Sequence, residues 1–221
     1  MKYQVGIIDD DESKITQLLT FIKLALNDEE GNLIKEKYRN IELEPFKIPL
    51  EKTVEKMVDA VCNLKPHALV VDFKLSSQKN ISYSGIEIAQ AIDKKLRGFP
   101  LFMLTSYQDD LYVQECFDVY QVFDFERYIN DEKERVEINS KIIEQIKKYN
   151  ATLQMWQEEL KQLISEVGKT AEIDERIIEL DSLLENSIDG NSALTPKIKR
   201  ELGAANRIQE LIEKIDILIK R

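Results

Sequence analysis

Cysteine and histidine are scarce in this chain of 221 residues, which contains two cysteines and one histidine. Cys62 and Cys116 are too few and too widely separated to form a disulfide framework or a zinc knuckle. We interpret both as ordinary buried thiols of a cytoplasmic protein. His67 follows Pro66 just before an apolar run, and we expect an exposed loop residue there rather than a catalyst.

Basic clusters and long apolar segments are also missing. The formal charge is −10, with 16 basic and 22 acidic residues in 1–129 and 15 basic and 19 acidic residues in 130–221. Because neither part is basic, we expect no nucleic acid and no anionic membrane surface as a partner. No apolar run approaches the roughly 20 residues that a membrane span requires. The first expected strand begins almost at Met1 and leaves no room for a signal peptide, so a cytoplasmic location is predicted.

Three apolar runs, by contrast, end directly on acidic or hydroxyl side chains. Val5 to Ile8 precedes Asp9-Asp10-Asp11-Glu12, Ala68 to Val71 precedes Asp72, and Pro100 to Leu104 precedes Thr105-Ser106. Continuous apolar runs of this length are typical of parallel strands that helices cover on both faces. In such sheets, functional groups collect at the carboxyl ends of the strands. The pattern therefore predicts that these carboxylates and hydroxyls meet at one edge of one sheet.

The order of the other elements in residues 1–129 supports such a sheet. Strands are expected over 2–8, 41–48, 68–73, 100–104 and 120–125, and helices over 13–26, 51–64, 86–96 and 109–118, with Ser13 as the N-cap of the first helix. Pro45 favours an edge position for the second strand, because proline cannot donate to a neighbouring strand. Alternation of strands and helices with short connections predicts an α/β domain with a doubly wound, five-stranded parallel sheet.

Residues 130–221 have a different, helical pattern. Apolar residues follow one another at intervals of three and four: Ile138, Ile142, Ile146, Tyr149, Leu153, Trp156, Leu160, Leu163 and Val167. This stripe predicts one long helix, and two shorter helices are expected over 173–188 and 198–218, the last beginning near Pro196. We expect an antiparallel bundle or coiled-coil region that acts as an output domain. A homodimer seam and a groove for a partner protein remain alternatives.

Four short motifs in residues 1–129 resemble the receiver domain of bacterial two-component response regulators. They are Ile7-Ile8-Asp9-Asp10, Val70-Val71-Asp72, Ser84-Gly85-Ile86-Glu87 and Met103-Leu104-Thr105-Ser106, in this order along the chain. The resemblance implies a flavodoxin-like receiver fold over a little over half of the chain. It also implies a histidine kinase or phosphotransfer protein as the upstream partner, and a downstream protein that binds the helical half.

The resemblance implies specific roles for five residues. Asp72 would accept the phosphoryl group, and Thr105 would contact that group through its hydroxyl. Asp9, Asp10, Asp72 and the backbone carbonyl of Lys74 would hold Mg²⁺. The residue types suit this chemistry, because a hard cation among carboxylates offsets their repulsion of a phosphoryl group. Beyond its own phosphorylation and dephosphorylation, such a protein is not an enzyme.

The chain departs from the family's pattern in two places. Receivers carry a lysine at the end of the fifth strand, but here Phe125, Glu126 or Arg127 takes that place, and a guanidinium differs from an ammonium in shape and reach. The loop between Asp72 and Gly85 is also longer than the family's usual one. The missing lysine supports an alternative in which the chain is a pseudo-receiver, a scaffold with the same fold that is never phosphorylated.

A remote enzymatic alternative uses the same acidic motif. Asp9-Asp10-Asp11 after a strand, with Thr105-Ser106 ending a later strand, also resembles the first motifs of haloacid-dehalogenase-like phosphatases. In that family Asp9 would be the nucleophile and Asp11 the general acid. Asp72 would then have no role, so the receiver interpretation is preferred.

Overall fold

The computed structural model describes residues 1–24, 26–27, 32–33, 35–75, 81–105, 122–167, 170–189 and 193–202. The chain divides into two compact units. The first comprises Met1–Lys94 and Gly98–Lys147, and the second comprises Lys95–Arg97 and Lys148–Arg221. The first unit thus continues past residue 129, where the sequence predicted a domain boundary, to Lys147.

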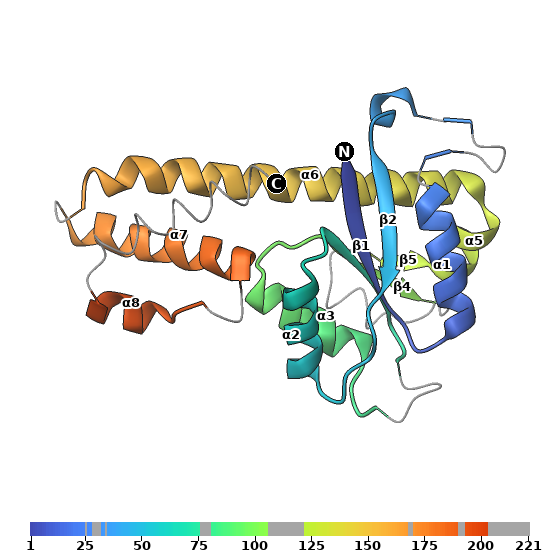
Figure 1. Cartoon of the computed structure of the whole chain (residues 1–221), viewed down its shortest axis with the longest axis horizontal. Coiled ribbons are helices and arrows are strands. Elements are labelled where there is room, and N and C mark those ends of the chain that lie inside the picture. Colours follow the sequence, from blue (N-terminus) through green and yellow to red (C-terminus); the bar gives the residue numbers. More distant parts are fainter. Residues whose placement is uncertain are drawn as a thin grey trace. The chain divides into compact units, whose positions relative to one another are not determined.

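A parallel sheet forms the centre of the first unit (Figure 1). Its strands in the described part of the chain are β1 (Lys2–Ile8), β2 (Glu42–Lys47), β3 (Ala68–Asp72), β4 (Leu101–Thr105) and β5 (Val122–Asp124). Their order is β2-β1-β3-β4-β5, and every neighbouring pair is parallel. An α/β unit with five parallel strands is therefore confirmed. So is the edge position that Pro45 predicted for its strand, since β2 ends the sheet on one side.

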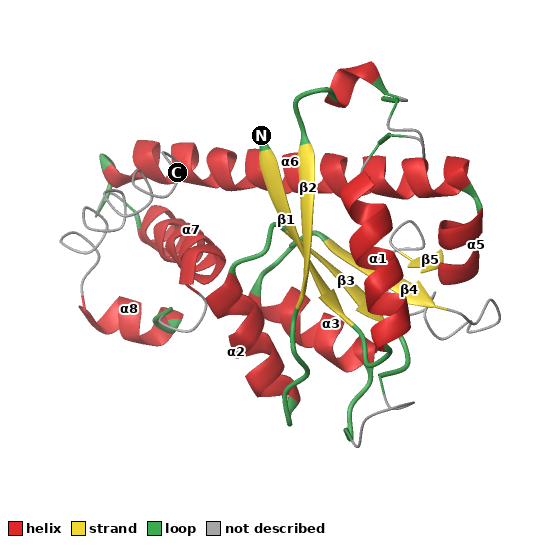
Figure 2. Ribbon diagram, turned by 45° about the vertical axis from the view of Figure 1, so that its right-hand side comes forward, coloured by secondary structure: helices red, strands yellow, loops and turns green. Residues whose placement is uncertain are grey.

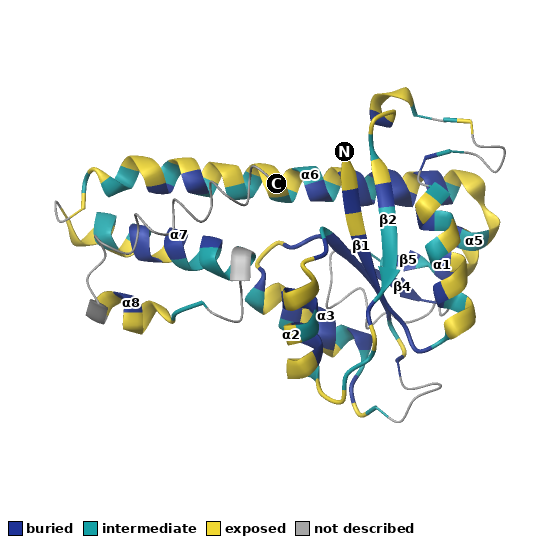
Figure 3. Ribbon diagram, in the orientation of Figure 1, coloured by how far each residue is buried: buried dark blue, intermediate teal, exposed yellow. Residues whose placement is uncertain are grey.

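Burial in the sheet follows the pattern of a parallel sheet between layers of helices. Every residue of β3 and β4 is buried, and Figure 3 shows the centre of the sheet in dark blue. Such strands need apolar side chains on both faces, which explains why their sequences are continuous apolar runs rather than alternating ones.

The helices of the first unit cover both faces of the sheet. In the described residues they are α1 (Glu12–Leu24), the 3-10 helix η1 (Glu36–Tyr38), α2 (Val54–Leu64), α3 (Gly85–Lys95), α5 (Phe125–Asn130) and the first part of α6 (Glu132–Ile164). Figures 1 and 2 show α2 and α3 on the opposite side of the sheet from α1 and α5. One core cluster joins α1, α5 and α6 to the sheet through residues such as Ile15, Val70, Tyr128 and Ile142.

Helix α6 takes part in both units, which explains the shift of the boundary. It runs unbroken for 33 residues, and its apolar stripe is divided between two cores. Ile138, Ile142 and Ile146 are buried in the core of the first unit. Leu153, Trp156, Leu160 and Leu163 belong to a separate cluster in the second unit. The predicted long helix is therefore present, but its first part covers the sheet.

The second unit continues with α7 (Ala171–Asp189) and α8 (Pro196–Leu202). α7 packs on the end of α6 through a cluster centred on Leu160, Ile177 and Leu180. Arg176 adds a bidentate ion pair, with Nε and Nη2 at 2.8 and 2.9 Å from the two carboxylate oxygens of Glu159. The buried Lys199 of α8 forms ion pairs with two acidic residues of α7, Asp181 and Glu185.

Several details differ from the sequence predictions. Ser13 does not cap α1, because the carboxylate of Asp11 accepts the hydrogen bonds from the backbone N–H groups of Ser13 and Lys14. His67 is partly buried, and its Nδ1 accepts a hydrogen bond of 2.9 Å from the backbone N–H of Gln4. The short helices η1 and α5 were not predicted. The predicted helix 109–118 and most of the predicted helix 198–218 lie outside the described residues.

None of the helices in the described ranges combines the length and the apolarity needed to cross a bilayer.

Candidate functional site

Three buried carboxylates meet at the carboxyl edge of the sheet. Asp9, Asp10 and Asp72 each offer one carboxylate oxygen, and these oxygens all lie within 4.8 Å of one another. β1 and β3 are parallel neighbours that pair Ile8 with Val71, so both strands end at the same level. The three side chains are only 2%, 2% and 5% exposed. Three of the four predicted metal ligands are therefore brought together, as the sequence predicted.

Backbone N–H groups orient two of these carboxylates. Asp9 Oδ1 accepts a hydrogen bond of 2.8 Å from the N–H of Asp11. Asp72 Oδ2 accepts one of 3.0 Å from the N–H of Lys74. Lys74 is thus tied to Asp72 through its amide nitrogen, and the role of its carbonyl as a metal ligand stays a prediction.

The acidic cluster is electrostatically costly without a cation. Burial and the neighbouring charge of Asp72 raise the pKa of Asp9 to about 7. Burial also raises the pKa of Asp72, although the attraction of Lys14 opposes this shift. Buried carboxylates that repel one another favour a bound cation, because the cation removes the cause of the repulsion.

Lys14 is a member of the site that the sequence analysis missed. It lies in the first turn of α1, and its Nζ is 3.3 Å from Asp72 Oδ1. The same ammonium group lies over the ring of Phe125, at 5.3 Å from the ring centroid. Burial works against the charged form, but attraction by Asp72 and Asp9 outweighs it and raises the pKa of Lys14. The available signal was its position in the helix that begins beside Asp9 and Asp10.

Arg127 does not take the place of the absent strand-five lysine. Its side chain is 60% exposed, and its Nη2 lies 3.4 Å from Glu134 Oε2, at the start of α6. The residue directly after β5 is Phe125, whose side chain is buried. An apolar ring therefore follows the end of β5, at a position where the resemblance to receivers implies a cation.

Thr105 ends β4 at the same edge of the sheet. β4 pairs with β3 so that Leu104 is opposite Asp72, which places Thr105 one position beyond Asp72 on the neighbouring strand. The side chain of Thr105 is buried. This placement agrees with the position predicted for it, and its role toward a phosphoryl group stays a prediction.

Gly85 packs directly against the backbone of Asp72. A Cβ atom at this position would lie 1.9 Å from the carbonyl oxygen of Asp72, which is far inside a van der Waals contact. The N–H of Gly85 donates to the carbonyl oxygen of Phe73 at 3.2 Å. Ser84 and Glu87 form a capping box around the same turn, in which each side chain accepts a hydrogen bond from the backbone N–H of the other residue. The Ser84-Gly85 motif thus sets the start of α3 against the end of β3.

Asp11 lies outside the group of three carboxylates. Its Oδ1 accepts a hydrogen bond of 2.8 Å from the N–H of Ser13 at the start of α1. Asp11 therefore acts as a helix cap. The same carboxylate would be the general acid in a haloacid-dehalogenase-like phosphatase, and here it is engaged in capping.

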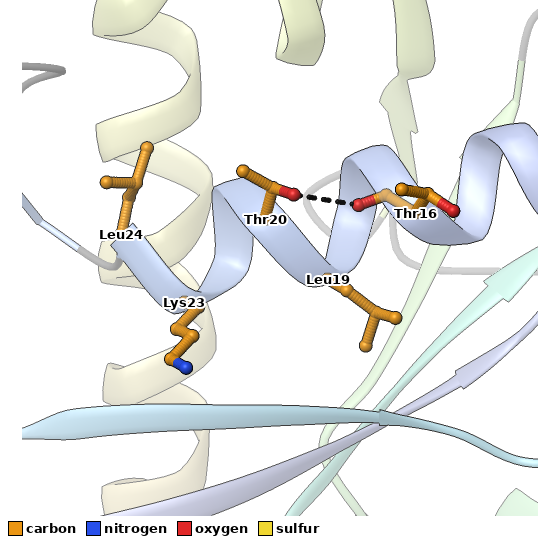
Figure 4. Close-up of a pocket in the computed structure, with 5 residues that line it drawn as sticks. All are labelled: Thr16, Leu19, Thr20, Lys23 and Leu24. Carbon is orange, nitrogen blue, oxygen red and sulfur yellow. Dashed lines mark hydrogen bonds between the residues drawn. The ribbon is translucent and has the colours of Figure 1, made fainter.

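A shallow hollow lies elsewhere on the surface, along one face of α1 (Figure 4). Its lining residues are Thr16, Leu19, Thr20, Lys23 and Leu24. It contains none of the clustered carboxylates, so it does not extend the candidate site.

Comparison with known proteins adds little to this geometry. No family model matches the chain, and no curated protein matches it. One solved structure, a trimeric coiled-coil segment of yeast Spc42 fused to another protein, is 14% identical, covering 81% of this chain and 91% of that chain with a TM-score of 0.44. Similarity at this level carries no argument about function, so any functional proposal rests on the site itself.

Proposed function

We propose that the first unit is a receiver domain of the two-component type, in which Asp72 accepts a phosphoryl group in the presence of Mg²⁺. The observation that carries this proposal is the group of three buried carboxylates, Asp9, Asp10 and Asp72, on adjacent strand ends. The strand order β2-β1-β3-β4-β5 is that of flavodoxin-like folds, whose ligands bind at the carboxyl ends of the strands. The described residues of the four motifs that resemble receivers, which are all but Ser106, lie around this edge.

Each residue of the site has a chemical task in the proposed reaction. A carboxylate oxygen of Asp72 attacks the phosphorus of the donor, the new P–O bond forms, and the bond to the donor's leaving group breaks. Asp9 and Asp10, with Asp72 and the carbonyl of Lys74, would hold the cation. When bound, Mg²⁺ supplies positive charge that offsets the negative charge of the phosphoryl oxygens. The hydroxyl of Thr105 donates a hydrogen bond to one of these oxygens.

The upstream partner in this proposal is a histidine kinase or a phosphotransfer protein of the cytoplasm. The downstream partner is a protein that binds the helical region, where α6 and α7 share an apolar cluster. Apart from its own phosphorylation and dephosphorylation, the chain catalyses no reaction. A homodimer through the helical region is a further part of the proposal.

The pseudo-receiver remains a second candidate because of one observation. Lys14 already supplies a positive charge to Asp72 in the unmodified chain. Such an ion pair can balance the acceptor without a metal ion, and the fold could then serve as a constitutive scaffold.

Incubation with a small acyl phosphate and Mg²⁺, followed by intact mass measurement, tests the proposal. We expect the mass of one phosphoryl group to be added to the wild type and to Asp59→Asn, a matched control on the exposed side of α2. We expect no addition to Asp72→Asn, or to the wild type when a chelator removes Mg²⁺. If the folded wild type gains no mass, the pseudo-receiver is the better description.

A further inference from the structure

Lys14 is held in place by the structure around it rather than by its own side chain alone. Asp11 caps the helix directly before it, and the neighbouring Ile15 is buried in the core of the first unit. Glu12 forms an ion pair with Lys47, which ends the edge strand β2. The first turn of α1 is thus attached to both the sheet and its core, so the backbone of Lys14 has a defined position.

The ammonium group of Lys14 points toward the acceptor carboxylate. Its Nζ is 3.3 Å from Asp72 Oδ1, and its side chain is 24% exposed, whereas that of Asp72 is 5% exposed. The ring of Phe125 covers the ammonium from the side of β5. Because the end of β5 offers an apolar ring, positive charge reaches the acceptor from α1.

We infer that Lys14 is the phosphoryl-binding cation of this site: it pairs with Asp72 in the unmodified chain and donates to a phosphoryl oxygen in the modified chain. This inference rests on the proposed function of Asp72. A phosphorylated side chain carries about −1.5 to −2 charge at neutral pH, so a cation next to the acceptor gains attraction when the group is added. Lys14 keeps its proton throughout and acts by charge and hydrogen bonding alone.

The same position has a second consequence, of opposite sign. An ammonium group at 3.3 Å from Asp72 repels a divalent cation that the same carboxylates attract. Removal of Lys14 should therefore tighten Mg²⁺ binding while it slows phosphoryl transfer. If Lys14 had only a structural role, its removal would change neither the Mg²⁺ affinity nor the rate of phosphoryl transfer, or would lower both through damage to the fold.

Lys14→Met tests the inference, because methionine keeps most of the apolar stem and removes the charge. With acyl phosphate and saturating Mg²⁺, we expect the rate of mass addition to fall about 10-fold or more, which corresponds to one charge-assisted hydrogen bond in the transition state. We expect Lys14→Arg to recover part of the rate. Calorimetric titration of the unmodified variants should show several-fold tighter Mg²⁺ binding in Lys14→Met than in the wild type, by loss of the repulsion.

Lys23→Met is the matched control, since Lys23 lies on the last turn of the same helix and lines the hollow rather than the acidic cluster. We expect it to retain the wild-type rate and Mg²⁺ affinity. If the wild type is modified, and Lys14→Met is modified equally fast and binds Mg²⁺ equally well, the inference about Lys14 is wrong while the proposed function stands. A folded wild type that is never modified overturns the proposed function, and this inference with it.

Discussion

Asp9 is the residue at which the cost of collecting carboxylates at one edge is greatest. It is 2% exposed, and burial and the charge of Asp72 raise its pKa from 3.8 to about 7. Between these two values the folded chain binds a proton that the unfolded chain does not bind. The contribution of Asp9 to the free energy of unfolding is therefore fully present below about pH 4 and is lost as the pH rises through about 7.

This linkage predicts a pH-dependent effect of Asp9→Asn in the absence of divalent cations. At pH 5 Asp9 is neutral in the folded chain but largely charged in the unfolded chain, so only part of its contribution is lost and the substitution should stabilise the protein less than at pH 8. At pH 8 the charged Asp9 is costly, and the variant should be more stable than the wild type by an amount on the order of 1–3 kcal/mol. Urea unfolding at both pH values measures the difference. An equal effect of the substitution at pH 5 and pH 8 would contradict the raised pKa.

Gly85 is the second residue on which the geometry of the site depends. A Cβ atom at this position would meet the carbonyl oxygen of Asp72 at 1.9 Å, and this neighbour is backbone that cannot rotate away. We expect Gly85→Ala to lower the free energy of unfolding by about 1–3 kcal/mol or more through overpacking. It should also weaken Mg²⁺ binding, because β3 must shift at its acidic end. Urea unfolding and calorimetric titration measure the two effects.

Ser84→Ala provides the comparison for Gly85→Ala. It removes the side chain that caps α3 but adds no atom near Asp72. A lost cap costs about 1 kcal/mol, and the Mg²⁺ affinity should stay close to that of the wild type. If Gly85→Ala lowers the free energy of unfolding and the Mg²⁺ affinity no more than Ser84→Ala does, the close approach of Gly85 to Asp72 does not matter for the site.

At the scale of the element, α6 is the helix for which the predicted and the observed packing differ most. One regular stripe of apolar residues covers the sheet at Ile142 and packs against α7 at Leu160. Both side chains are 1% exposed. Substitutions at the two positions should therefore affect different units, although both positions belong to the same apolar stripe of one continuous helix.

Aspartate substitutions at these positions separate the two cores. We expect Leu160→Asp to cost about 3 kcal/mol or more by burial of an unpaired charge, and to unfold the α6–α7 pairing while the sheet keeps its structure. Ile142→Asp should instead unfold the sheet unit. Trp156 is the single tryptophan of the chain and lies against the second cluster, so its fluorescence reports on that cluster. Hydrogen exchange of β3 and β4 reports on the sheet.

Met155→Asp is the control for these two substitutions, because Met155 is 57% exposed on the same helix. It should leave both the Trp156 fluorescence and the exchange of the sheet unchanged. If Leu160→Asp and Ile142→Asp each unfold the entire chain in one step, the two cores are energetically coupled rather than separate.

At the scale of the whole molecule, acidic residues outnumber basic ones in both parts of the chain. The net charge of −10 is spread over both parts of the chain. In the second unit, some charged side chains form ion pairs with one another. Arg176 pairs with Glu159, and Lys199 pairs with Asp181 and Glu185. In the proposed function, the acidic edge of the sheet receives the signal and the helical region delivers it to a protein partner.

The sequence by itself determined the class of the first unit and the members of the acidic cluster. Strand and helix positions follow from the period of apolar residues, which is a local property of the chain. The convergence of Asp9, Asp10 and Asp72 follows from the rule that parallel strands carry their functional groups at one edge. Neither inference requires a distance between side chains, and both agree with the structure.

Only the tertiary structure decided which cation faces Asp72, which side chain lies at the end of β5, and where α6 changes from one core to the other. Lys14 and Asp72 are 58 positions apart, and their contact depends on how α1 is turned about its own axis against the sheet. Phe125 and Arg127 were indistinguishable candidates until α5 placed one in the core and the other toward Glu134. The stripe of α6 is equally apolar on both sides of Lys147, so its division is determined by the elements that pack against it. Such choices depend on long-range packing, which a local pattern does not encode.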